Sequence, residues 1–185
     1  RLARFYTYDH LKDFVVDNET LNCIKKIISS GEIAKLSSDR VWFETSRALN
    51  SSNPNLYFEK IISLNLLDPF FNNLEISDCD SHCDQEVRWS ELQINNNFEL
   101  GKNLPIPNEC MNASRMLKNI YKITQKTKEE DLISIINSSH FIRNEEIITK
   151  LCTLPNLKEN REFILKITKE IKNTDFSFLS DTPNE

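Results

Sequence analysis

The chain has 185 residues, of which 39% are hydrophobic and 28% charged, and its formal net charge at pH 7 is -5. This composition is typical of a globular protein with a buried core, and no uninterrupted apolar run approaches the roughly 20 residues that cross a bilayer. The acidic total excludes a protein that binds nucleic acid over its whole surface, so any RNA contact must be confined to a local basic face.

Glycine and cysteine content narrow the function further. With only 2 glycines, a glycine-rich phosphate loop is excluded. The 5 cysteines are an odd number, and no signal peptide precedes them, which favours reduced thiols in the cytoplasm. Because the sequence begins with Arg1 rather than methionine, we expect it to be a piece of a longer protein.

Apolar residues recur at helical spacing along most of the chain, which predicts an all-α fold. A first helix is expected over residues 2–14. Asp17 is expected to cap a second helix that ends at the glycine of "SSGE". The buried stripe predicted for this second helix is Leu21, Ile24, Ile27 and Ile28.

The next two helices carry clear start signals. Ser37 or Ser38 is expected to cap a third helix within "LSSDRVWFETSRAL", with Trp42 in the core. Asn53 followed by Pro54 predicts the start of a fourth helix. Its expected inward residues are Leu56, Ile61, Ile62 and Leu64.

The helical periodicity breaks in the polar, acidic segment 67–86, which is the candidate domain boundary. A short helix over 86–94 follows. We therefore expect three regions: a helical neck and body over 1–71, an irregular linker with one short helix over 72–106, and a C-terminal helical region over 107–185.

The C-terminal region contains four expected helices. The first runs over 107–125, and Thr127 with Glu130 predicts a capping box at the start of the next. The last two are expected over 143–154 and 157–173, followed by an acidic tail.

The sequence contains only weak signals for a metal site or a catalytic nucleophile. "DCDSHCD" supplies Cys79, His82 and Cys83, but structural zinc needs a second ligand pair, and none has a recognisable spacing. An acidic loop with incidental thiols is the favoured interpretation, so no metal site and no catalytic residue are predicted. A cysteine–histidine pair that meets only in space stays open.

Two helices carry arginines that could contact RNA. Arg1 and Arg4 are interleaved with aromatic residues, a mixture that suits phosphate binding and base stacking. In the third helix, Arg40 and Arg47 lie four and three residues from Glu44. Local ion pairs with Glu44 would explain these two arginines without any ligand.

The order of four segments, "RLARFYTY", "FVVDNETL", "SGEIAKLSSDRVWFETSRALNSSNP" and "LYFEKIISLNLLDPFF", resembles the neck and body of bacterial CCA-adding enzymes, the class II tRNA nucleotidyltransferases. The first segment resembles the arginine-rich helix that follows the family's catalytic head. "LSSDRVWFE" resembles the family pattern L-[ST]-x-E-R-[VI]-W-x-E.

The second half resembles the appended His-Asp phosphohydrolase domain of some of these enzymes, through "VRWSELQIN" and "LPIPNECMNASRMLKNIYKI". The His-Asp position reads Ile94-Asn95, so the metal ligands are missing. We expect a degenerate helical remnant without phosphohydrolase activity.

The resemblance implies that the parent transfers CMP and AMP from CTP and ATP to the tRNA 3′ end, with Mg²⁺ bound by a head that lies outside this chain. The chain itself would hold tRNA, need no cofactor and be inactive alone. Arg1, Arg4, Arg40 and Arg47 would face RNA or the nucleotide junction. The alternatives are the C-terminal part of a bacterial poly(A) polymerase and a non-catalytic helical interaction domain.

Overall fold

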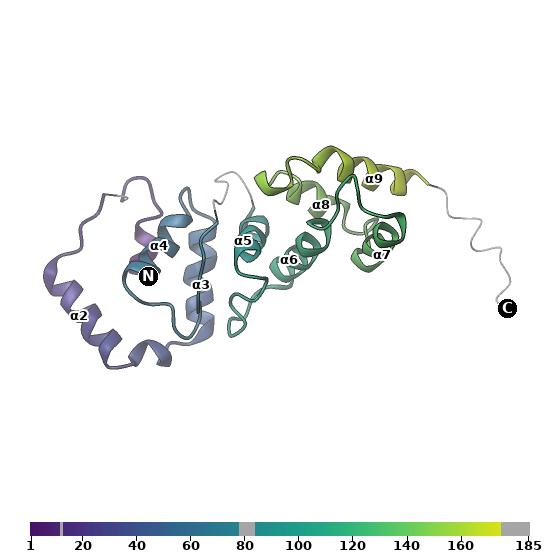
Figure 1. Ribbon diagram of the computed structural model, residues 1–185. Helices are drawn as coiled ribbons and strands as arrows, with labels where there is room; N and C mark the ends of the chain where they lie inside the picture. Colours follow the sequence, from purple (N-terminus) through teal and green to yellow (C-terminus); the bar gives the residue numbers. More distant parts are fainter. Residues whose placement is uncertain (12, 78–83, 175–185) are drawn as a thin grey trace. The chain divides into compact units, whose positions relative to one another are not determined.

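The computed structural model describes residues 1–11, 13–77 and 84–174, and within these ranges it contains helices and no strand (Figure 1). The all-α prediction is confirmed. The chain divides into two compact units, the first ending at Arg115 and the second starting at Met116, so the division falls inside a helix. The first unit thus extends past residue 71, where the sequence placed the end of the neck and body.

The helices follow one another along the chain, with the longest connection between α4 and α5, and two of them are short helices of 3₁₀ type. Their bounds are α1 Leu2–Phe5, α2 Asn18–Ser29, η1 Glu32–Lys35, α3 Ser38–Leu49, α4 Asn55–Ser63, α5 Gln85–Asn95, α6 Asn108–Ile120, α7 Glu129–Ser139, α8 Glu145–Leu151, η2 Pro155–Leu157 and α9 Arg161–Asn173.

The first helix is much shorter than predicted, because α1 ends at Phe5. Beyond it the backbone turns through hydrogen bonds between residues three apart, including Thr7 N to Arg4 O at 3.0 Å. The Thr7 hydroxyl also donates to Arg4 O at 2.7 Å. Aromatic and β-branched residues with low helix propensity follow Arg4, and the threonine side chain competes for the helical carbonyl.

Asp17 is confirmed as the cap of α2, but the buried apolar stripe predicted for this helix is not. The Asp17 carboxylate accepts from Thr20 N at 2.9 Å, and the helix ends before Gly31, whose φ is +72°. No residue of α2 is buried, and Ile27 is 41% exposed. The helix is amphipathic in sequence, but its apolar stripe faces a partly open cavity rather than a packed core.

The third and fourth helices pack by their large residues. Ser37 caps α3, because its hydroxyl accepts from Arg40 N at 3.3 Å. In α4 the buried side chains are Tyr57, Phe58 and Ile61. The inward orientation predicted for Ile62 is wrong, since this side chain is 41% exposed.

The start of α4 also differs from the expected proline-initiated cap. Pro54 itself occupies the cap position, and no side chain caps the helix. The Asn53 amide instead donates to the Asp9 carboxylate at 2.8 Å, so it fastens the turns after α1 to the start of α4.

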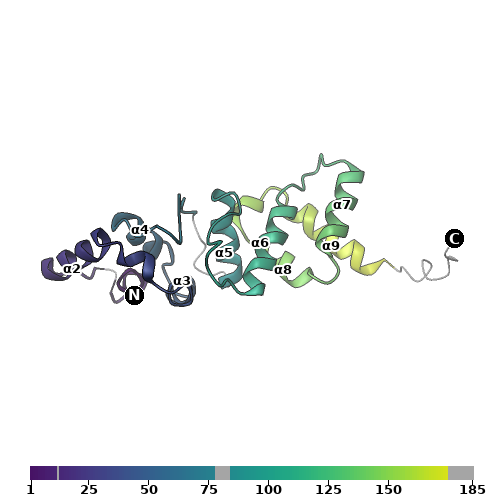
Figure 2. The ribbon, with the colours of Figure 1, turned by 90° about the horizontal axis from the view of Figure 1, so that it is seen from below.

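The short helix predicted over 86–94 is α5, and it lies beside α3 in both views (Figures 1 and 2). Trp89 on α5 and Trp42 on α3 pack edge to face with ring centroids 5.1 Å apart. The buried Arg88 guanidinium donates to the Leu49 carbonyl, and to Ser51 O at 2.8 Å. The guanidinium cation thereby lies at the carbonyls of the C-terminal end of α3, where the helix dipole stabilises a positive charge.

In the second unit, α8 and α9 lie at the predicted places and contact each other. The α6 helix ends at Ile120, five residues earlier than expected. The capping box predicted for α7 does not form, because the Thr127 hydroxyl accepts from Thr124 N at 2.8 Å and turns away from the helix start.

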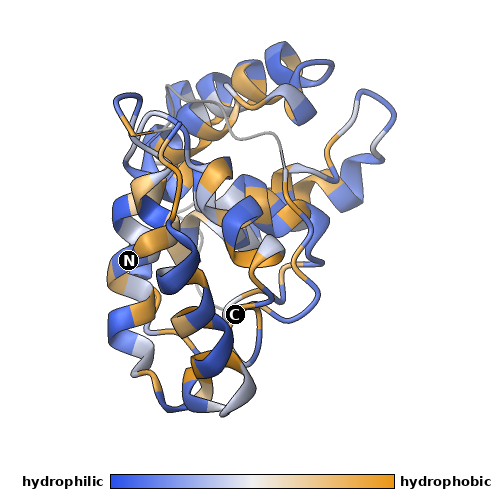
Figure 3. Cartoon of the chain, turned by 90° about the vertical axis from the view of Figure 1, so that its left-hand side faces the viewer, coloured by the Kyte–Doolittle hydropathy of each residue, from blue (hydrophilic) through white to orange (hydrophobic). Residues whose placement is uncertain are grey.

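Apolar and polar residues alternate along the helices, as amphipathic helices require (Figure 3).

Gly101 supports the aromatic core of the first unit in a way that no other residue type can. Its φ is +71°, and an added Cβ would lie 3.0 Å from the Trp89 ring and 3.3 Å from Ile106. Gly31 has the same backbone conformation, but no atom lies within 4 Å of the corresponding position. Comparing substitutions at the two glycines therefore distinguishes the cost of backbone strain, which both would have, from the cost of a steric contact, which only Gly101 would have.

We expect Gly31→Ala to lower the free energy of unfolding by about 1 kcal/mol, the cost of a left-handed backbone with a Cβ. Gly101→Ala should cost about 2 kcal/mol more, because Trp89 must also move. Urea denaturation of both variants measures the difference. Equal losses in the two variants would show that the Trp89 contact is unimportant.

Candidate nucleic-acid interface

The four arginines singled out in the sequence have different environments. Arg4 is buried, whereas Arg1, Arg40 and Arg47 are exposed. Arg1 and Arg4 lie at α1, which packs against α3, the helix that carries Arg40 and Arg47. The structure therefore brings two arginine pairs that lie far apart in sequence onto neighbouring helices.

Glu44 on α3 joins these helices, but not through the partners predicted for it. Its Oε2 atom accepts from Arg4 Nε at 2.7 Å, and its Oε1 atom lies 3.6 Å from Arg1 Nε. The side chains of Arg4 and Glu44 are only 8% and 7% exposed. Within the part of the chain that the structure describes, Glu44 forms no ion pair with Arg40 or Arg47, so the local pairs expected along α3 were wrong.

The reason is a difference in burial between side chains that are neighbours on α3, since Glu44 is buried and the two arginines are exposed. Glu44 is buried on α3 with Thr45 and Ala48, and its carboxylate meets Arg4 of α1. Arg40 and Arg47 lie on the exposed side of the same helix. A carboxylate placed beside the buried Arg4 must neutralise that charge, because an unpaired cation in the interior is costly.

A hydrogen-bond network surrounds this ion pair. The Arg4 guanidinium also donates to the Tyr8 hydroxyl, and Thr45 Oγ1 lies 3.0 Å from the Tyr57 hydroxyl. Burial raises the pKa of Tyr57 to about 12, so this phenol stays neutral and serves as a fixed polar contact between α3 and α4. The network is structural and offers no group poised for proton transfer near neutral pH.

The charges of the pair reinforce each other. Burial alone would raise the pKa of Glu44, but the Arg4 hydrogen bond and the surrounding positive charge outweigh it, so the pKa of Glu44 is lowered. Burial likewise opposes the charge on Arg4, and the hydrogen bond that Arg4 donates to Glu44 overcomes this and raises the pKa of Arg4. Both groups are therefore ionised at neutral pH.

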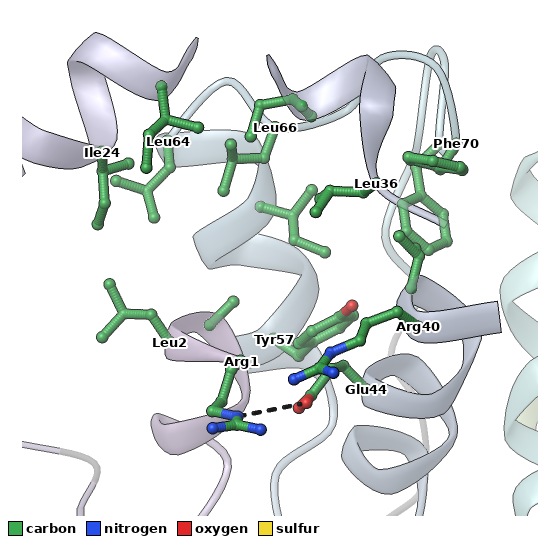
Figure 4. Close-up of a pocket in the computed structure, with 16 residues that line it drawn as sticks. Arg1, Leu2, Ile24, Leu36, Arg40, Glu44, Tyr57, Leu64, Leu66 and Phe70 are labelled. Atoms are coloured by element: carbon green, nitrogen blue, oxygen red, sulfur yellow. Dashed lines mark ion pairs between the residues drawn. The ribbon is translucent and has the colours of Figure 1, made fainter. Parts of the chain in front are cut away.

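A cavity of about 280 Å³ opens beside the ion pair (Figure 4). Arg1, Arg40 and Glu44 lie together on one side of it. Its remaining walls are mainly apolar and come from α1, α2, η1, α4 and the segment after α4, with Ile24, Leu36, Leu64, Leu66 and Phe70 among them.

One feature of α3 was missed in the sequence. Phe43 is 52% exposed, and the guanidinium carbon of Arg47 lies 5.4 Å from the centroid of its ring. Residues 40, 43 and 47 follow the spacing of one helix face, so the sequence did contain a signal for this row. It was overlooked because Glu44 offered a simpler partner for both arginines.

In the described ranges 1–11, 13–77 and 84–174, no three His, Cys, Asp or Glu side chains lie close enough together to hold a metal ion. Cys79, His82 and Cys83 lie outside these ranges. At Ile94-Asn95, where the sequence resemblance implied a His-Asp position, Asn95 donates to Ile76 O at 3.3 Å. Ile94 and Asn95 supply neither the imidazole nor the carboxylate that such a metal needs.

Two of the cysteines are unsuited to nucleophilic chemistry. Burial raises the pKa of the Cys110 and Cys152 thiols to about 11. At neutral pH they stay protonated, whereas a nucleophilic cysteine must be a thiolate. Both thiols are buried, and the Cys110 sulfur accepts a hydrogen bond from Gln85 Nε2 at 3.6 Å.

Comparison with known proteins gives a consistent assignment. Residues 13–77 match the family model described as "Probable RNA and SrmB-binding site of polymerase A". The chain is 37% identical over 75 residues to the Multifunctional CCA protein of Haemophilus influenzae, a match that covers 40% of this chain and 18% of the relative.

Two further relatives agree. The CCA-adding enzyme of Actinobacillus succinogenes is 26% identical over 136 residues, covering 71% of this chain and 33% of the relative. The CCA-adding enzyme of Buchnera aphidicola is 33% identical over 76 residues, a match that covers 41% of this chain and 18% of the relative. No solved structure matches the chain.

The matches confirm the resemblance expected from the sequence: the chain is similar to CCA-adding enzymes, and residues 13–77 match an RNA-binding family. The chain spans between 18% and 33% of the length of these three relatives.

The buried pair predicts a defined pH dependence. Glu44→Gln should lower the free energy of unfolding at pH 7 by about 3 kcal/mol, because it leaves Arg4 buried without an anion. The carboxylate is stabilising because its folded pKa lies below the ordinary value of 4.5. Its contribution is therefore complete above pH 4.5 and disappears as the pH falls through the lower folded pKa.

The measurement is urea denaturation of the parent chain and the Glu44→Gln variant between pH 7 and pH 3. The two curves of stability against pH should converge at the acidic end. Glu145→Gln is the control, because Glu145 forms an exposed pair with Lys172 at 2.6 Å and should cost less than about 1 kcal/mol. A difference that stays constant down to pH 3 would contradict the stabilising role of the Glu44 charge.

Proposed function

We propose that this chain, a relative of bacterial CCA-adding enzymes, is the tRNA-holding part of a tRNA nucleotidyltransferase. The match of residues 13–77 to an RNA-binding family carries the proposal. The exposed arginines of α3, which lies within this segment, supply its chemistry. Arginine is suited to this role because its guanidinium binds phosphate oxygens through two parallel hydrogen bonds.

The arginines divide into two roles under this proposal. Arg4 positions α1 on α3 and is too buried to reach a nucleic acid. Arg40 and Arg47 contact phosphates, and Arg1, whose side chain is 62% exposed, lies at the edge of the same region. Because the net charge of the chain is -5, these contacts must be local, and the affinity for RNA in general should be modest.

The parent enzyme would transfer CMP and AMP from CTP and ATP to the 3′ end of tRNA. A head domain, encoded before residue 1, would supply the carboxylates for Mg²⁺ and the nucleotide site. Two metal ions in such a site stabilise the attacking 3′ oxygen and the leaving pyrophosphate. This chain would contribute by holding the RNA, and it would be inactive alone.

The reaction takes place in the cytoplasm under this proposal. Among the described residues, the structure contains no helix long and apolar enough to cross a bilayer. Under the same proposal, the region from α5 to α9 would be a degenerate remnant of a phosphohydrolase domain, kept for its helical packing rather than for metal-dependent catalysis.

A second candidate is the C-terminal part of a bacterial poly(A) polymerase, because the description of the matching family names polymerase A. Such an enzyme acts on single-stranded 3′ ends, so RNA preference distinguishes it from an enzyme that holds the folded acceptor arm of tRNA. A helical interaction domain without RNA function would bind neither RNA.

We expect the chain to bind a tRNA acceptor minihelix more tightly than a single-stranded RNA of equal length, with an affinity that falls as salt rises. Fluorescence anisotropy at about 50 and 200 mM salt measures this. The double variant Arg40→Gln, Arg47→Gln should weaken binding and reduce the dependence on salt by about two released ions.

The matched control is Lys122→Gln, Lys126→Gln, which removes the same charge from two exposed positions of the second unit. A preference for single-stranded RNA would favour the poly(A) polymerase alternative. Equal losses in both double variants, or no binding to either RNA, would contradict the proposed interface on α3.

A further inference from the structure

Phe43 occupies an unusual place on α3. This large apolar side chain is 52% exposed. Its neighbour Trp42, in contrast, is 8% exposed and packs in the core. The exposed half of this side chain contributes nothing to folding, because its apolar surface stays in water. The position therefore suggests a role other than packing.

Cations flank Phe43 on the same helix face. Arg40 precedes it by three residues and Arg47 follows it by four, a spacing that places all three side chains in one row. At about 1.5 Å of rise per residue, the two arginine Cα atoms are separated by about 10 Å along the helix axis. The Arg47 guanidinium already lies against the ring, with 5.4 Å between its central carbon and the ring centroid.

The row is locally basic within an acidic chain. Across the described residues, neither Arg40 nor Arg47 forms an ion pair, because Glu44, although it neighbours both on the helix surface, binds Arg4 and Arg1 instead. Asp39 is the acidic residue in the first turn of the helix, where it complements the helix dipole. The row thus offers two cations to a ligand with separated negative charges.

The chemistry of the row fits single-stranded nucleic acid better than a protein. A protein interface has a core of several apolar side chains, and no second residue of α3 among the large hydrophobics is exposed. A single aromatic ring between two arginines instead matches one base with phosphates on either side. Charge complementarity therefore selects the occupant.

We propose that Phe43 is the stacking platform for one unpaired base at the 3′ end of the bound RNA, with Arg40 and Arg47 on the adjacent phosphates. The inference rests on the proposed RNA-binding function and names the part of the RNA that α3 recognises. Stacking on an aromatic ring is tolerant of base identity, so Phe43 detects the presence of an unpaired nucleotide rather than its sequence.

The test uses two acceptor minihelices, one blunt and one with a single-stranded 3′ extension that contains 2-aminopurine, a fluorescent base that is quenched when it stacks. The variants are Phe43→Ala, Phe43→Leu and Phe43→Tyr, and the control is Ile62→Ala, which truncates another exposed apolar residue of the same unit. A thermal midpoint for each variant establishes that it is folded.

We expect the parent chain to quench 2-aminopurine and to prefer the extended minihelix. Phe43→Ala and Phe43→Leu should each weaken binding of the extended RNA about fivefold or more and abolish the quenching, with no effect on the blunt RNA. Phe43→Tyr and Ile62→Ala should behave like the parent chain.

Other results would overturn the proposal. If Phe43→Leu binds like the parent, the side chain acts through apolar bulk and not through stacking. If no Phe43 variant changes binding of the extended RNA, the stacking role is wrong, while RNA binding by the chain remains established. If neither minihelix binds, the proposed function fails as well.

Discussion

The ion pair between Arg4 and Glu44 is the constraint on which the first unit depends. Two charges that are almost removed from water cannot be left unpaired, so α1 and the buried side of α3 must stay in contact. Tyr8, Tyr57 and Thr45 extend the same network into the neighbouring segments. A pair of this kind contributes little net stability compared with well-packed apolar residues, but it specifies one arrangement of the helices.

That arrangement gives α3 two different sides. The buried side carries Glu44 for the ion pair and Trp42 for the contact with α5, so it is committed to folding. The exposed side carries Arg40, Phe43 and Arg47, none of which is needed for the core. Because Glu44 is committed to the buried Arg4, Arg40 and Arg47 form no ion pair within the described residues, so the contact that fixes α3 also leaves these two arginines available at the surface.

The sequence predicted the helices better than their contacts. Local signals were sufficient for the Asp17 and Ser37 caps, because capping depends on residues three apart. They failed for Glu44, because Arg4 is 40 residues away and a local partner looked adequate. They failed also for α2, whose apolar spacing indicates an amphipathic helix but does not say how much of the stripe is covered.

The central claim is that the exposed side of α3 is the surface that holds RNA. Ultraviolet crosslinking of the chain to an acceptor minihelix, followed by mass spectrometry of the crosslinked peptides, tests it most directly. The account predicts nucleotide adducts on the peptide that contains residues 38–49. Adducts confined to peptides from α7, α8 and α9 would contradict it, because the RNA would then be held by the second unit.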